Sequence, residues 1–171
     1  MAKNVGWAAV FSLAAALLQS TLFRRIAPYH TVPDLALGIL VYSAYVNGIM
    51  TGQVTGFFSG LILDFISNAP LGLHCLLRTI IGASVGLLKG TFFLDAFFLP
   101  MALCATATLS KALMLFLLHL LLAGAVPYYP LVSPTLWIEL MFNSLSAPLL
   151  FGLLKLFQPL LVGKAASDAS R

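Results

Sequence analysis

The chain has 171 residues, of which 61% are hydrophobic and only 8% are charged. Soluble domains carry roughly 25% charged residues, so this composition excludes a water-soluble fold and indicates an integral membrane protein. The net charge of +4 does not indicate nucleic-acid binding, because the nine Lys and Arg residues are scattered apart from the pair Arg24-Arg25. A nucleic-acid groove needs clustered cations.

Apolar runs long enough to cross a hydrocarbon core of ~30 Å recur along the whole chain. We therefore predict an all-α integral membrane protein, a compact bundle of six transmembrane helices in one domain over residues 1–163, with a short cytoplasmic tail at 164–171. The predicted spans are residues 5–23, 34–47, 51–67, 73–90, 97–123 and 134–157. The first apolar run exceeds a signal-peptide core, so it is interpreted as an uncleaved helix.

Turn signals separate these spans. Pro33-Asp34 is typical of a helix start, and Asn47-Gly48 divides an apolar stretch that is too long for one span. Cations near the span ends favour a topology with both termini in the cytoplasm. That topology places five cations inside and two outside: Lys3, Lys89, Lys155, Lys164 and Arg171 against Arg24 and Arg25.

The third and fourth spans carry matching stripes of residues spaced four apart, and such residues share one helix face. An antiparallel hairpin would pair the two stripes from the turn outward: Asp64 with Arg78, Gly60 with Gly82, Gly56 with Gly86, and Gly52 with Gly90. Glycine stripes allow membrane helices to approach closely. They indicate packing within the chain or, alternatively, a face for a partner's transmembrane helix. The Asp64–Arg78 pair would be a structural clamp or, alternatively, a pocket lip or partner contact.

Other polar residues interrupt the last two spans. Lys111 lies in mid-span, where it could neutralise Glu139, line a pocket, or extend to the membrane surface. Asn143 and Pro148 predict a polar interhelical contact and a kink. The histidines lack the spacing of a metal site, and both cysteines are expected to be buried thiols. Because catalytic motifs are also missing, we predict a non-enzymatic protein without a cofactor or metal.

The segment from Gly56 to Ser67, GFFSGLILDFIS, continues to Leu71-Gly72-Leu73 and resembles the central signature of the MreD family of rod shape-determining proteins. Weaker similarities extend over most of the chain, among them Leu17-Leu18-Gln19, Pro33 and Lys155. The residues that match the family pattern are Gly56, Gly60, Asp64 and Gly72, with Asn143 and Pro148 matched less closely. Arg78 has no place in that pattern.

The resemblance implies a non-catalytic scaffold in the bacterial inner membrane that binds the transmembrane segment of MreC. It also implies that the protein acts with MreB, RodA and the elongation transpeptidase in peptidoglycan synthesis. The fold it implies is similar to that of the substrate-binding S component of energy-coupling factor transporters. A vitamin-binding S component is the alternative function, since Ala8, Ser12 and Ala16 could form a docking surface. The sequence leaves self-association open.

Overall fold

The computed structural model describes residues 2–21, 33–67, 69–91, 97–122, 126, 128–129 and 131–161. Arg24, Arg25 and the predicted tail at 164–171 lie outside these residues. The helices are, in chain order, α1 (Ala2–Thr21), α2 (Leu35–Asn47), α3 (Ile49–Ile66), α4 (Leu73–Leu87), α5 (Phe98–Leu122), α6 (Pro134–Leu156) and the short α7 (Gln158–Leu161).

Each of the six predicted segments contains one helix over most of its described residues. Three helices, α3, α5 and α6, are long and apolar enough to cross a membrane, while α2, α4 and residues 4–19 of α1 are apolar but shorter. The predicted turn at Asn47-Gly48 is present, and Gly48 adopts a positive φ of 96° between α2 and α3. A left-handed backbone favours glycine, so the sequence itself divides the long apolar stretch at this residue.

Capping residues explain where two of these helices begin. The side chain of Asp34 accepts a hydrogen bond from the backbone N–H of Leu37 at 2.9 Å, so Asp34 is the N-cap of α2. Ser133 caps α6 in the same way, and Pro134 occupies the first turn, where no N–H is needed. The predicted helix start at Pro33-Asp34 is therefore confirmed.

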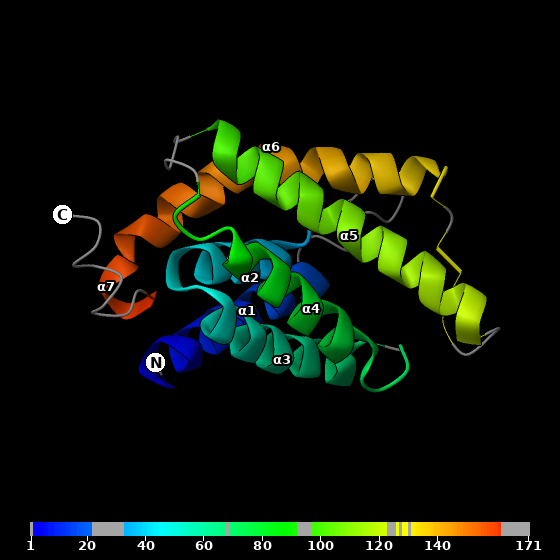
Figure 1. Ribbon diagram of the computed structural model, residues 1–171, viewed down its shortest axis with the longest axis horizontal. Helices are drawn as coiled ribbons and strands as arrows, with labels where there is room; N and C mark the ends of the chain where they lie inside the picture. The colour runs from blue at the N-terminus through cyan, green and yellow to red at the C-terminus, as the bar shows by residue number, and fades with distance from the viewer. Residues whose placement is uncertain are drawn as a thin grey trace.

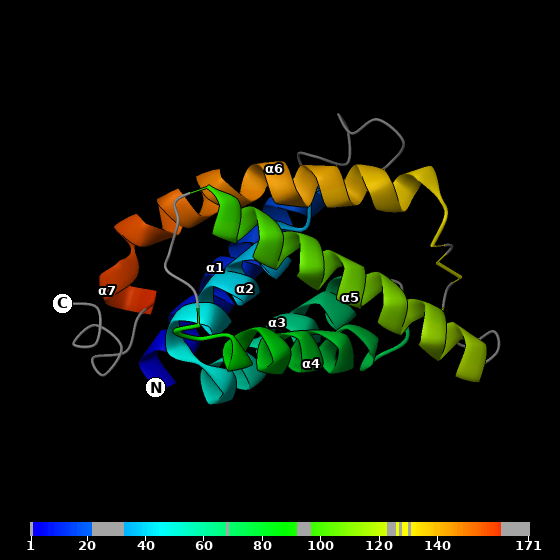
Figure 2. The same ribbon diagram turned by 45° about the horizontal axis from the view of Figure 1, so that its top comes forward.

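The helices form two groups, which Figures 1 and 2 show from two directions. The first group is α1 to α4, and the second is the pair α5 and α6, which lies across it. Helix α2 is central, because it contacts α1, α3, α4, α5 and α6 and all its residues from 36 to 45 are buried. Helix α6 contains Pro148 and changes direction along its length, and α7 then folds back against α1.

The α3–α4 hairpin is the closest helix pair, but its register differs from the prediction. A Cβ added to Gly52 would meet the carbonyl oxygen of Gly82, eight residues before the predicted partner Gly90. Gly90 lies beyond the end of α4 at a φ of 75°. The glycine stripes therefore do face the partner helix, as expected for packing within the chain, but shifted by about two helical turns.

Backbone contact continues along the hairpin. Added Cβ atoms would meet main-chain atoms of the opposite helix at every glycine of the contact: Gly56 against Arg78, Gly60 against His74 and Cys75, and Gly86 against Ile49. None of the predicted glycine pairs is thus in register. Two helix backbones can come this close only where the residues between them have no side chain, so the glycines of α3 and α4 set the distance between the two helices.

Candidate functional site

Four charged side chains meet between the two helix groups, and we call them the charge cluster: Asp34, Arg78, Lys111 and Glu139. The Nη2 of Arg78 on α4 donates to the Oδ1 of Asp34 at 2.6 Å. The Nζ of Lys111 on α5 lies 3.6 Å from the Oδ2 of Asp34 and donates to the Oε1 of Glu139 on α6. The cluster therefore joins α2 and α4 of the first group to both helices of the second.

These charges are largely shielded from the surroundings. The side chains of Arg78 and Glu139 are 4% and 9% exposed, and those of Asp34 and Lys111 are 18% and 16% exposed. An isolated charge is costly in such a place, whereas two acids and two bases in contact neutralise one another. Within the described chain, the Nη1 of Arg78 is buried without a hydrogen-bond partner. The guanidinium is neutralised through its other terminal nitrogen, Nη2, which is paired with Asp34.

Neutral polar groups extend the cluster on the α6 side. The backbone N–H of Asp34 donates to the Oδ1 of Asn143 at 2.6 Å, and the Nδ2 of Asn143 donates to Thr108 at 2.9 Å. The hydroxyl of Tyr129 donates to the Oε2 of Glu139 at 2.7 Å. Burial, together with the adjacent Glu139, raises the pKa of the Tyr129 phenol, so this hydroxyl remains a donor at neutral pH.

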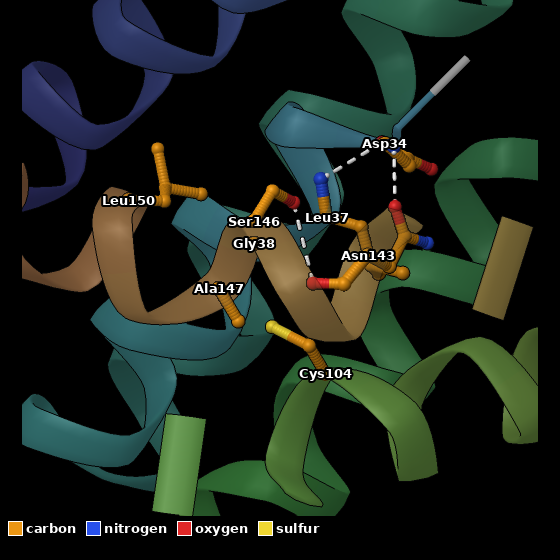
Figure 3. A pocket seen from close by; sticks show the side chains of 8 residues that line it. All are labelled: Asp34, Leu37, Gly38, Cys104, Asn143, Ser146, Ala147 and Leu150. Carbon is orange, nitrogen blue, oxygen red and sulfur yellow. Dashed lines mark hydrogen bonds between the residues drawn. The ribbon is translucent and has the colours of Figure 1, made fainter. Parts of the chain in front are cut away.

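A small cavity adjoins the cluster between α2 and α6, with Cys104 of α5 facing it (Figure 3). Its volume is about 10 Å³, and it is lined by Asp34, Leu37, Gly38, Cys104, Asn143, Ser146, Ala147 and Leu150. A space of this size corresponds to about one water molecule. It is too small for an organic ligand, so the arrangement is suited to holding helices together rather than to binding a substrate.

Asp64 does not pair with Arg78, and the predicted clamp is wrong. Its Oδ2 accepts the backbone N–H groups of Gly72 at 3.0 Å and Cys75 at 3.1 Å, while its Oδ1 accepts that of His74 at 2.9 Å. The carboxylate thus satisfies free donors at the start of α4. This bonding places the first turn of α4 beside Asp64, which explains the shifted register and leaves Arg78 farther along the helix, beside Asp34.

The other predicted polar residues lie on α5 and α6. Lys111 pairs with Glu139, which selects the ion pair from the three alternatives. Asn143 makes the expected polar contact between helices, and Pro148 lies inside α6. Among the described residues, no group of three or more His, Cys, Asp or Glu side chains could hold a metal ion. The ring of His119 instead contacts the carbonyl oxygen of Val126 at 2.8 Å.

Asp34 is the residue that sequence reasoning missed. Pro33-Asp34 was sufficient to predict a cap, and a capping carboxylate retains a second oxygen that can accept a cation. Within the predicted spans, Asp64 and Glu139 already balance Arg78 and Lys111. A count of charges therefore gave no signal that Asp34, at the start of its span, would take the place of Asp64 beside Arg78.

The fold and the cluster define a class of protein, a helical membrane protein whose buried charges join its helices. The family comparison is consistent with this class. The family model for the rod shape-determining protein MreD matches residues 1–157. The chain belongs to the MreD family, which implies a role in rod shape determination and is not a known enzyme family. The chain has no match among curated proteins or among solved structures.

Proposed function

We propose that this protein is a non-catalytic inner-membrane scaffold of the bacterial rod complex that binds the transmembrane segment of MreC and thereby helps to control peptidoglycan synthesis. Membership of the MreD family over residues 1–157 carries the proposal. The geometry is consistent with it, because buried ion pairs join the helices and the adjoining cavity has a volume of only about 10 Å³. MreB, RodA and the elongation transpeptidase would be reached directly or through MreC.

A groove along α5 is the best candidate for the MreC contact. It has a volume of about 480 Å³ and mostly apolar walls, lined by Thr106, Leu109, Ser110, Ala112, Leu113, Leu131, Leu136 and Trp137. Thr106 and Ser110 are small, exposed and one helical turn apart. Small residues let a second helix come close enough for van der Waals contact, which drives helix association in lipid.

Co-purification from bacterial membranes tests the function. A tagged chain is expected to recover MreC, and recovery of an energy-coupling transmembrane subunit without MreC would overturn the proposal. Substitution Ser110→Phe fills the groove and is expected to reduce MreC recovery by about tenfold, equivalent to about 1.4 kcal/mol of binding free energy. Leu149→Phe is the matched control, because Leu149 is 79% exposed on α6 and does not line the groove.

The proposed topology has six spans, both termini in the cytoplasm and the N-termini of α2, α4 and α6 toward the periplasm. The three long apolar helices and the distribution of cations support it. Reporter fusions at residue 171 and in the predicted loop after residue 122 test it. The first should be active only as a cytoplasmic reporter and the second only as a periplasmic one; the reverse pattern would refute the topology.

A further inference from the structure

The contact between the α5–α6 pair and the first helix group, here called the interlayer interface, is divided into two halves of different chemistry. One half holds the charge cluster with Asn143 and Thr108. The other half is apolar and contains side chains from α2, α5 and α6, among them Leu40, Leu103, Phe151 and Leu154. The charged groups therefore lie at one end of the interface only.

The two halves hold the helices together by different means. Apolar side chains gain little by leaving lipid for one another, because lipid tails are as apolar as leucine. Charged groups are different, since separating them exposes each to hydrocarbon or requires water to enter. The charge cluster therefore contributes more than the apolar half to keeping the interface closed.

Helix α6 has a weak point at the boundary between the halves. Pro148 lies between Asn143, in the polar half, and Phe151, in the apolar half. Proline provides no N–H for the carbonyl one turn earlier, that of Ser144, and such positions are where helices bend. The part of α6 that carries Glu139 can accordingly move relative to the part that carries Phe151.

We propose that the charge cluster is a latch, and that α5 and the first part of α6 swing away from α2 and α4 about Pro148 when the latch is broken. This is a conformational device and does not depend on MreC binding. A ligand site is a poorer account of the same cluster, because its two acids and two bases already neutralise one another and the adjoining cavity is only about 10 Å³.

Cys104 reports on the opening. It lines the cavity at the interface and is 3% exposed, so a small permeant maleimide should alkylate it slowly in membrane vesicles of the Cys75→Ser chain. Lys111→Met leaves Glu139 without its cation, and we expect alkylation about a hundredfold faster, since removal of one partner from a buried pair leaves an uncompensated charge. The charge-balanced variant Lys111→Met/Glu139→Gln should be alkylated at an intermediate rate, because it carries no uncompensated charge but also lacks the ion pair that joins α5 to Asp34.

Two controls separate opening from general unfolding. Leu117→Met alters an exposed position on the same helix that does not line the groove, and should leave the rate unchanged. In the Cys104→Ser chain, Cys75 reports on the α3–α4 hairpin, and its rate should not respond to Lys111→Met. The latch is refuted if Cys104 keeps its slow rate in the Lys111→Met chain, or if Cys75 accelerates by the same factor.

Two further measurements can be made even if the Lys111→Met chain does not fold or accumulate in the membrane. In the milder Glu139→Gln chain, adding Pro148→Ala should slow the alkylation of Cys104, because an added N–H restores the helix at the proposed hinge; an unchanged rate would overturn the hinge. In the unaltered chain in nanodiscs, backbone amides of residues 134–147 should exchange with deuterium faster than those of residues 49–66. Equal protection of the two segments would also contradict the proposal.

Discussion

The α3–α4 hairpin and the interlayer interface hold helices together in opposite ways. In the hairpin, glycines bring two backbones into direct contact, and the buried carboxylate of Asp64 bonds to main-chain N–H groups. At the interlayer interface, pairs of charged side chains span the distance between helices. The first contact depends on the absence of side chains and the second on the balance of charge, so different substitutions should break each.

The largest effect is expected in the hairpin. Gly52→Leu would force a side chain against the backbone of Gly82, and neither main chain can move aside as a flexible side chain would. We expect a destabilisation of about 3 kcal/mol or more, at or beyond the upper end of ordinary overpacking. Gly152→Leu is the matched control, because nothing lies within 4 Å of its added Cβ. Unfolding in mixed micelles would measure both, and equal stability would contradict the hairpin geometry.

The next largest effect is expected at Asp34. Asp34→Ala removes the ion-pair partner of Arg78 and the cap of α2 together, and should destabilise by about 3 kcal/mol. Asp34→Asn keeps a good capping side chain but not the charge. It should fall between Asp34→Ala and the unaltered chain in a denaturation series. If Asp34→Asn is as stable as the unaltered chain, the charge contributes nothing and capping is the whole role.

A smaller effect is expected at Asp64. Double variants can show that Asp64 and Arg78 belong to separate regions, because their effects on the free energy of unfolding should then add. Asp64→Asn should cost about 1–2 kcal/mol through weaker capping. Combined with Arg78→Gln, the losses should add to within about 0.5 kcal/mol, because the two side chains share no bond. The combination Asp34→Asn/Arg78→Gln should instead be non-additive. Recovery of stability by Asp64→Lys/Arg78→Asp would restore the discarded Asp64–Arg78 clamp.

The smallest effect is expected at the edge of the charge cluster. Tyr129→Phe removes one hydrogen bond to Glu139 and should destabilise by about 1 kcal/mol, the usual contribution of such a bond. Tyr128→Phe is the neighbouring control, since Tyr128 is 63% exposed. Thermal melting in detergent compares the two, and a larger loss for Tyr128→Phe would contradict the assigned contact.

The helices were predictable because their signals are local. Apolar runs, Pro33-Asp34, Asn47-Gly48 and the glycine spacing each depend on neighbouring residues, and these features were found where they were expected. The hairpin register was not predictable from spacing alone. Two stripes with a period of four match equally well after a shift of four or eight residues, so the choice depends on how Asp64 bonds to the first turn of α4.

The partner of Arg78 could not be predicted from a local sequence pattern either. Asp34 and Arg78 are 44 residues apart and come from helices whose arrangement depends on the whole bundle. The Lys111–Glu139 pair was easier to anticipate, because α5 and α6 are consecutive and the two charges are buried in a low-dielectric setting that requires pairing. The requirement for charge balance therefore limits which acids can pair with a buried base, and the arrangement of the helices determines which of them does.

The order of the four cluster charges along the chain has a consequence for biogenesis. Asp34 is synthesised first, Arg78 then neutralises it, Lys111 adds a cation, and Glu139 neutralises that cation last. A chain entering the bilayer in this order never carries more than one unmatched charge from this set. If translation stops before residue 139, Lys111 and Arg78 have only the carboxylate of Asp34 as a partner, and one positive charge stays unmatched. Such an arrested chain should therefore be a preferred substrate for membrane quality-control proteases.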